Sequence, residues 1–196
     1  MAGETAIRFD RVQAANANAK ALGELHARSW RAAYKGVLPD AYLGDAAKAD
    51  RAEHWRRAVA SMRARDMLLT ASAGDRLAGF LFAQHRPEAG FDIFLDTLLV
   101  DPSMRSSGIG TSLLQHLAGE IAKDKRKGLY LWVIDGNASA DAFYRSLGAE
   151  PADRGISVML GGEVPQTRLV WPDPAILARR CGERLADPAK RRRRDS

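Results

Sequence analysis

Residues 91–134 constrain the fold more than any other part of the sequence. The nearly continuous apolar run 91–100 predicts a strand, and an Asp-Pro pair ends it. Leucine and isoleucine at helical spacing then predict a helix over 110–122, and the wholly apolar run 129–134 predicts a short strand buried on both faces. A strand, a helix and a second strand in this order form a parallel crossover. The sequence therefore requires a sheet that contains a parallel pair of strands.

Helix and strand signals alternate along the rest of the chain. Apolar spacing predicts a helix over 16–34 and a second one from an N-cap at Asp45 to about Ala64. A Gly-Asp pair between two apolar runs predicts a hairpin, and Pro87 is expected to end its second strand. Strands are expected at 5–9, 67–73, 76–85, 91–100, 129–134, 156–160 and 167–171, and the later helices at 110–122, 138–147 and 175–186. The fold class is α/β (α+β), a single domain whose mixed, mostly antiparallel sheet of about seven strands is flanked by helices.

Composition indicates a globular chain with one hydrophobic core. The chain has 196 residues, of which 46% are hydrophobic and 28% charged, so the core needs no metal or disulfide. The single cysteine, Cys181, excludes an intrachain disulfide and a zinc site built from several cysteines. The longest apolar run is far shorter than the roughly 20 residues of a membrane helix, and no signal-peptide pattern begins the sequence. We expect a cytoplasmic protein with no membrane contact and no metal.

The basic charge is concentrated at the end of the chain. The formal net charge is +6, and residues 190–196 hold five basic and one acidic side chains, which leaves +2 for the other 189 residues. This distribution favours a solvated basic tail over a basic groove across the fold. The alternative is a contact between the tail and nucleic acid or another acidic partner.

The segment between the strand at 91–100 and the following helix has the features of a phosphate-binding loop. Two glycines let the backbone close around an anion, and the first amides of a helix have no acceptor inside the helix. An arginine and three hydroxyl groups add further donors to phosphate oxygens. The predicted pyrophosphate site comprises Arg105, Ser106, Ser107, Gly108, Ile109, Gly110 and Thr111.

Other phosphate-binding patterns fit this loop less well. A Walker A loop has a lysine before its final Ser or Thr, and Gly110-Thr111 has none. A dinucleotide-binding fingerprint has a third glycine or alanine where this chain has Leu113, and its first glycine follows the strand immediately. Here the first glycine, Gly108, comes eight residues after Val100. An ordinary glycine-containing loop between a strand and a helix remains an alternative.

Two linked motifs resemble the Gcn5-related N-acetyltransferase (GNAT) superfamily. Arg-Ser-Ser-Gly-Ile-Gly at 105–110, after Leu-Leu-Val-Asp-Pro, is similar to the family motif Arg/Gln-x-x-Gly-x-Gly/Ala. The run from Asn137 to Gly148, behind an apolar strand, resembles the next strand-helix block of that family. The resemblance is specific over 95–150. It implies an acetyltransferase domain over residues 1–172 and a C-terminal extension with a basic tail over 173–196.

The resemblance implies an enzyme, an acyltransferase that uses acetyl-CoA as co-substrate. It would transfer the acetyl group to a primary amine by direct attack in a ternary complex, without a covalent intermediate on Cys181, which lies outside the motifs. The acceptor, a small-molecule amine or a protein amine, is not set by the sequence. Two alternatives stay open: a catalytically weak acyl-CoA-binding module, and a nucleic-acid-associated protein that uses the arginine-rich tail. A homodimer through the last strands is compatible with the pattern.

The resemblance also implies roles for residues outside the loop. The pantetheine arm of the coenzyme would pair with the backbone of Leu98, Leu99 and Val100, where a bulge splays the family's strand and one amide polarises the thioester carbonyl. Tyr144 would hydrogen-bond or protonate the leaving thiolate. Asn137 lies two helical turns before Tyr144 and would face the coenzyme from the same side. The alternatives are a half-buried tyrosine with a wet hydroxyl and an asparagine that only caps its helix.

The acceptor side is predicted from three residues. Asp96 is the leading candidate for the base that deprotonates the amine, directly or through water, and Asp92, His85 and His26 are weaker candidates. The alternative role of Asp96 is that of a carboxylate at the edge of the sheet, paired with a basic neighbour. Trp30 and Tyr34 are four residues apart on one helix, so their rings can form one wall of an acceptor pocket. Ordinary packing of the helix on the sheet is the alternative for both.

Overall fold

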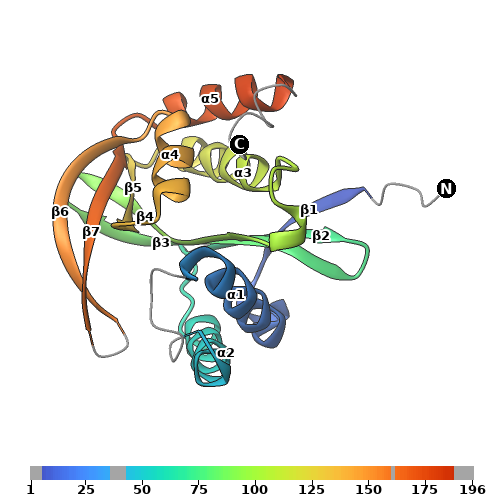
Figure 1. The fold of residues 1–196 in the computed structure, drawn as a ribbon. Coiled ribbons are helices and arrows are strands. Elements are labelled where there is room, and N and C mark those ends of the chain that lie inside the picture. The colour runs from blue at the N-terminus through green and yellow to red at the C-terminus, as the bar shows by residue number, and fades with distance from the viewer. Residues whose placement is uncertain (1–5, 36–42, 160–161, 188–196) are drawn as a thin grey trace. The chain divides into compact units, whose positions relative to one another are not determined.

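The computed structural model describes residues 6–35, 43–159 and 162–187 (Figure 1). The strands within these ranges are β1 (Ile7–Val12), β2 (Met67–Ala73), β3 (Arg76–Glu88), β4 (Phe91–Val100), β5 (Leu129–Ile134), β6 (Glu150–Met159) and β7 (Gly162–Trp171). The helices are α1 (Ala19–Tyr34), α2 (Asp45–Ala60), α3 (Ile109–Lys123), α4 (Ala138–Ser146) and α5 (Pro174–Ala186). Two short 3-10 helices are η1 (Ala14–Asn16) and η3 (Pro102–Met104).

The strands form one mixed sheet in the order β1-β2-β3-β4-β5-β7-β6. β4 pairs parallel with β5, as the crossover pattern predicts, whereas β1 with β2, β5 with β7 and β6 with β7 pair antiparallel. The predicted fold class is therefore confirmed. The chain divides into two compact units, Met1–Phe82 with Thr97–Leu113 and Ala83–Asp96 with Leu114–Ser196, and we describe them separately.

The core of the first unit surrounds the indole of Trp55. This side chain is fully buried and meets the rings of Phe80 and Phe82 edge to face, with centroids 4.8 and 5.7 Å away. Leu22 and Leu25 of α1 complete the cluster. Helices α1 and α2 run side by side (Figure 1), because Gly23 leaves room for the backbone of α2 at Ala52.

The core of the second unit is built around Trp171 at the end of β7. Its indole is fully buried and donates a hydrogen bond to the carbonyl of Leu147 at 2.9 Å. Gly148, with φ +88°, follows the end of α4 and allows the chain to turn into β6, which confirms its predicted place at the helix C-terminus. In α5, Leu177 and Cys181 are buried, so the first part of the predicted C-terminal extension belongs to the folded unit.

Several predicted boundaries were wrong. β3 continues through Pro87 to Glu88, since a proline is tolerated where the neighbouring strand does not need its N–H. β6 and β7 begin earlier than predicted, because their first halves contain few large apolar residues and the prediction rested on apolar runs. Helix α2 is capped by Gly44 without a side-chain hydrogen bond, rather than by Asp45, and it ends at Ala60, before Ala64.

The helical glycines Gly23 of α1 and Gly119 of α3 should respond in opposite ways to alanine. A Cβ on Gly119 meets nothing within 4 Å, so Gly119→Ala should raise the free energy of unfolding by about 1 kcal/mol through helix propensity alone. A Cβ on Gly23 would lie 2.8 Å from the Cα of Ala52. Gly23→Ala should therefore lower the free energy of unfolding by about 1 kcal/mol, because the steric cost exceeds the propensity gain. Urea denaturation of both variants measures the difference, and shifts of the same sign would contradict the close approach of α1 and α2.

Candidate functional site

The loop between β4 and α3 has the backbone geometry of an anion site. We call residues 101–108 the β4–α3 loop. Ser106 and Gly108 adopt positive φ angles of 61° and 89°. The first hydrogen bond of α3 runs from the amide of Ser112 to the carbonyl of Gly108 at 2.9 Å. The amides at 109–111 therefore have no acceptor within the helix, and the exposed side chains of Arg105, Ser106 and Ser107 precede them.

Gly79 of β3 positions the start of α3, and the sequence analysis missed it. A Cβ on Gly79 would lie 2.9 Å from the Cγ2 atom of Ile109 and 3.0 Å from the carbonyl oxygen of Leu99. Only a glycine lets the first residue of α3 approach the two strands this closely. The available signal was an isolated glycine inside an otherwise apolar strand.

Asp101 fixes the beginning of the β4–α3 loop, and the sequence analysis treated it only as a strand terminator. Its Oδ1 accepts hydrogen bonds from the amide and the hydroxyl of Ser103, at 3.0 and 2.6 Å. Its Oδ2 accepts from Arg76 at 2.8 Å and from Arg28 at 3.2 Å. Burial alone raises the pKa of the Asp101 carboxyl, but the hydrogen bonds from Ser103 and Arg76 outweigh it and hold this pKa well below its ordinary value. Asp101 is therefore a buried, ionised group with four donors.

Helix α1 also reaches the end of β4 through Ser29. This side chain is buried, and its hydroxyl donates to the carbonyl oxygen of Val100 at 3.2 Å. Leu98, Leu99 and Val100, the residues predicted to face the pantetheine arm, are half-buried at this end of β4. In the described part of the sheet, Ile93 and Phe94 of β4 pair with Leu129 and Tyr130 of β5. This parallel pairing therefore stops well before Leu98.

Trp30 packs between α1 and α2. Its half-buried ring lies 5.5 Å from the ring of His26, and the guanidinium of Arg51 lies over it at 5.5 Å from the centroid. These contacts join α1 to α2, and they test neither the acceptor-pocket role of Trp30 nor its alternative, packing of the helix on the sheet. The side chain of Tyr34 lies outside the described residues, as does the basic tail at 190–196, so the predicted two-ring wall stays a prediction.

His26 is unsuited to be the general base. It is buried, and its Nδ1 accepts a hydrogen bond from the indole of Trp55 at 2.9 Å. Burial, followed by the charges of Arg51 and His54, lowers the pKa of His26 from 6.5 to about 3. A group with this pKa holds a proton too weakly to take one from an ammonium ion near neutral pH. Asp92 has a structural partner, since its carboxylate accepts from the amide of Lys127 at 2.7 Å.

The remaining predicted catalytic residues lie in the second unit. Tyr144 is 9% exposed, and its ring packs against Phe143 and Trp171 at centroid distances of 5.3 and 6.1 Å. Asn137 caps α4, because its Oδ1 accepts from the amide of Ala140 at 3.2 Å, which is the alternative that the sequence left open. Asp96 is exposed on β4. The grouping of these residues with the β4–α3 loop in one site remains a prediction from the sequence.

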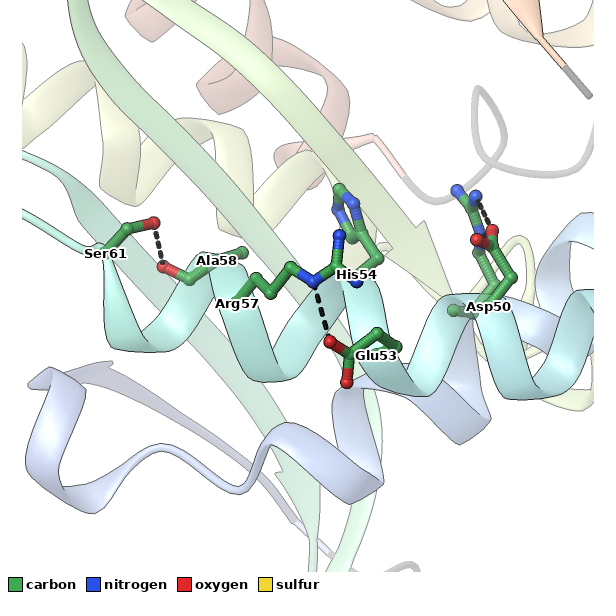
Figure 2. A pocket seen from close by; sticks show the side chains of 7 residues that line it. Asp50, Glu53, His54, Arg57, Ala58 and Ser61 are labelled. Carbon is green, nitrogen blue, oxygen red and sulfur yellow. Dashed lines mark hydrogen bonds and ion pairs between the residues drawn. The ribbon is translucent and has the colours of Figure 1, made fainter.

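A pocket of about 330 Å³ lies along α2 (Figure 2). It is lined by Asp50, Arg51, Glu53, His54, Arg57, Ala58 and Ser61. Its charges are largely paired with one another: Arg57 binds Glu53 at 2.6 Å, and Arg51 pairs with Asp50. Hydrogen bonds from Arg56 and Arg57 lower the pKa of Glu53 to about 2. The pocket includes none of the residues that the sequence assigned to the site.

Neither a metal-ligand cluster nor a membrane-spanning helix is present in residues 6–35, 43–159 and 162–187. Among them, no group of three or more His, Cys, Asp or Glu side chains is placed to hold a metal ion. Within the same ranges, no helix has the length and apolar character needed to cross a membrane.

Comparison with known proteins identifies the family. Residues 20–149 match the model of the Acetyltransferase (GNAT) family, so the chain belongs to that family. It is 36% identical over 87 residues to the [Ribosomal protein bS18]-alanine N-acetyltransferase of Escherichia coli strain K12, a match that takes in 40% of this chain and 59% of that relative. It is 24% identical over 160 residues to the Uncharacterized N-acetyltransferase YuaI of Bacillus subtilis strain 168, which covers 81% of this chain and 90% of the relative.

Solved structures show the same fold. The crystal structure of the PaiA N-acetyltransferase from Thermoplasma acidophilum in complex with coenzyme A has a TM-score of 0.60 at 19% identity, covering 83% of this chain and 98% of that one. The ribosomal-protein-S18-alanine N-acetyltransferase from Escherichia coli has a TM-score of 0.62 at 19% identity, covering 86% and 94%. These likenesses support the GNAT fold that the two motifs predicted.

Replacement of Gly108 should abolish coenzyme binding if the β4–α3 loop holds a diphosphate. Valine disfavours a φ of +89°, and its side chain would occupy space beside the helix amides. We expect Gly108→Val to weaken acetyl-CoA binding at least about 100-fold, which corresponds to roughly 2.7 kcal/mol, measured by isothermal titration calorimetry.

Gly90 supplies a matched control for this variant. It has a similar φ of +85° in the turn between β3 and β4, and no atom lies within 4 Å of a Cβ placed there. Gly90→Val therefore adds the same backbone strain away from the loop and should leave the affinity unchanged. Tight binding by a folded Gly108→Val protein, or an equal loss in both variants, would contradict the phosphate assignment.

Acid should destabilise the fold partly through His26. Because the pKa of His26 is lowered in the folded protein, the unfolded chain binds a proton at this residue at a pH where the folded chain does not. The free energy of unfolding is therefore highest above pH 6.5 and decreases as the pH falls toward 3. Relative to His26→Gln, which can still accept from Trp55 but does not titrate, the wild-type protein should lose about 1.5 kcal/mol between pH 6.5 and pH 5. Urea denaturation at several pH values measures this. His116→Gln, at an exposed position, is the control, and parallel pH profiles of the wild type and His26→Gln would disprove the idea.

Proposed function

We propose that the protein catalyses transfer of an acetyl group from acetyl-CoA to a primary amine. The proposal rests on the β4–α3 loop of this GNAT-family chain. Two residues with positive φ, Ser106 and Gly108, precede the helix amides at 109–111, which have no acceptor within the helix. Such amides, together with the positive end of the helix dipole, favour a diphosphate. Arg105 adds a guanidinium suited to phosphate oxygens. The loop thus fits the diphosphate of coenzyme A, and acetyl-CoA supplies an activated thioester.

The end of β4 is the proposed binding surface for the pantetheine arm. Amide groups of an extended ligand can pair with the backbone of Leu98, Leu99 and Val100 as an added strand does. The paired residues of β4 and β5 support this role. β4 pairs with β5 at Ile93 and Phe94, so the backbone of residues 98–100 is not paired with β5. One amide in this stretch would polarise the thioester carbonyl.

Tyr144 is the proposed acid and Asp96 the proposed base. Two aromatic neighbours hold the Tyr144 ring, which limits the directions open to its hydroxyl. Reference pKa values of about 8.5 for a thiol and 10 for tyrosine make full proton transfer to the thiolate uphill by roughly 2 kcal/mol, so a strong hydrogen bond is sufficient. The exposed carboxylate of Asp96 would take the proton from the attacking ammonium group, directly or through water.

The acceptor is proposed to be an amine bound beside α1, with Trp30 and Tyr34 on that side. The name of the Escherichia coli relative says that it acetylates an alanine of ribosomal protein bS18. A peptide that begins with alanine is therefore the first acceptor to test, beside free amino acids, polyamines and aminoglycosides. A cytoplasmic location and a homodimer through the last strands remain predictions.

Loss of the Tyr144 hydroxyl should slow turnover without weakening coenzyme binding. With the best amine of the panel, Tyr144→Phe should reduce kcat about 10- to 100-fold, the lower part of the range for a positioned proton donor. The dissociation constant for acetyl-CoA should stay within about twofold of wild type, because the hydroxyl acts on the leaving thiolate and the intact thioester carries none. Thiol release measures kcat, and calorimetry measures affinity.

Each failure of this experiment has a distinct meaning. Unchanged turnover would remove Tyr144 from the mechanism. A wild-type protein that binds acetyl-CoA but releases thiol only at the background rate with every amine would instead be an acyl-CoA-binding module. Salt-dependent nucleic-acid binding that disappears on deletion of residues 188–196 would favour the role of the arginine-rich tail.

A further inference from the structure

We propose that Asp101 and Ser29 are positioning residues that couple the β4–α3 loop to helix α1, so that coenzyme binding and the order of α1 reinforce each other. The inference rests on the proposed function, because it concerns how the coenzyme-binding loop is held. It goes beyond that function by assigning a role to a buried polar network that the proposed chemistry does not use.

The Asp101 carboxylate joins three elements of the first unit. Its side chain is 4% exposed, and its four donors come from η3, β3 and α1. Arg76 also donates to the hydroxyl of Ser103 at 3.0 Å, which closes a ring of polar contacts around the loop entrance. The amide of Asp101 donates to the carbonyl of Ala78 at 2.8 Å, directly before Gly79. The first turn of the loop is thus fixed from both its side chain and its backbone.

Electrostatics make this arrangement sensitive to the carboxylate. One negative charge lies between the guanidinium groups of Arg28 and Arg76, whose side chains are about half exposed. Asp101→Asn removes that charge, so the two cations repel each other, and it leaves one acceptor oxygen for the four donors. The loop entrance and the contacting turn of α1 should then loosen together.

Ser29 supplies a second contact between the same two segments. Its side chain is 1% exposed, and its hydroxyl donates to the carbonyl of Val100, one residue before Asp101. Adjacent residues of α1, Arg28 and Ser29, therefore bind adjacent residues at the end of β4. A double contact of this kind fixes both the distance and the rotation of α1 relative to the loop entrance.

The position of these contacts gives them a functional consequence. Val100 belongs to the backbone proposed to bind pantetheine, and Trp30, the residue after Ser29, belongs to the proposed acceptor side. A ligand that tightens the loop must also favour the arrangement of α1 that makes both contacts, since a broken buried hydrogen bond is costly. Linkage is reciprocal, so an ordered α1 raises coenzyme affinity by the same factor.

Hydrogen exchange of the full chain, with and without coenzyme A, tests the coupling. In the wild-type protein, coenzyme A should slow exchange at residues 105–112 and also across α1. In Ser29→Ala the effect at 105–112 should remain, and the effect in α1 should become smaller, because one of its two contacts with this segment is removed. Arg28→Gln removes only the charged contact of α1 and should act in the same way. Asp101→Asn should in addition weaken coenzyme binding about tenfold, as expected for lost hydrogen bonds to a charged group.

Ser61→Ala is the matched control. Its exposed hydroxyl donates to the carbonyl of Ala58 within α2, at 3.3 Å, and makes no contact with the loop in any hydrogen bond of the described residues. Exchange and affinity should therefore match wild type. The readout in Ser29→Ala and Arg28→Gln keeps the proposal testable if Asp101→Asn does not fold.

The outcomes separate this inference from the proposed function. Coenzyme A that protects 105–112 but not α1 in the wild-type protein overturns the coupling and leaves the proposed function standing. Equal protection of α1 in wild type, Ser29→Ala and Arg28→Gln also overturns it. A wild-type protein that binds no coenzyme A by calorimetry overturns the proposed function, and the coupling with it.

Discussion

The close approach of α3 to the ends of β3 and β4 is the constraint on which the first unit depends. That approach is possible because Gly79 has no side chain where Ile109 and the Leu99 carbonyl meet it. Because the start of α3 is fixed against these two strands, the β4–α3 loop must turn sharply. The positive φ angles of Ser106 and Gly108 make this turn possible. The helix amides then face outward without acceptors in the helix. The geometry on which the proposed diphosphate site rests thus depends on close packing at a single glycine.

Sequence patterns predicted those parts of the fold whose partners are local. The apolar spacing of α3 and the run 129–134 were sufficient because periodicity alone reports which face is buried. The first halves of β6 and β7 were missed because they contain few large apolar residues and no apolar run marks them. Contacts over long sequence distances were equally hidden. Arg28 and Asp101 are 73 residues apart, so only the folded structure shows that a strand-ending aspartate holds the loop.

Burial has opposite outcomes for His26 and Asp101, two of the buried titratable groups of the first unit. His26 has one neutral donor, the Trp55 indole, so burial wins and keeps the imidazole uncharged. Asp101 has four donors, two of them guanidinium groups, so the charged form wins despite burial. From the sequence, His26 was a weak base candidate and Asp101 was only the end of a strand. The number of hydrogen-bond donors around each group decides whether it is charged, and the sequence does not reveal that number. His26, with one donor, is neutral, and Asp101, with four donors, is ionised.

Recognition by main-chain donors also explains why a positioning carboxylate matters here. A lysine in a phosphate loop can follow its ligand, since its side chain is flexible and its charge acts in every direction. Amides at a helix start cannot move independently, so their affinity depends on where the loop holds them. The Asp101 network sets that position from three elements, and α1 is one of them. A site of this construction is therefore tied to α1 by its own geometry, and changes in α1 that suit a different amine would be felt at the phosphate end as well.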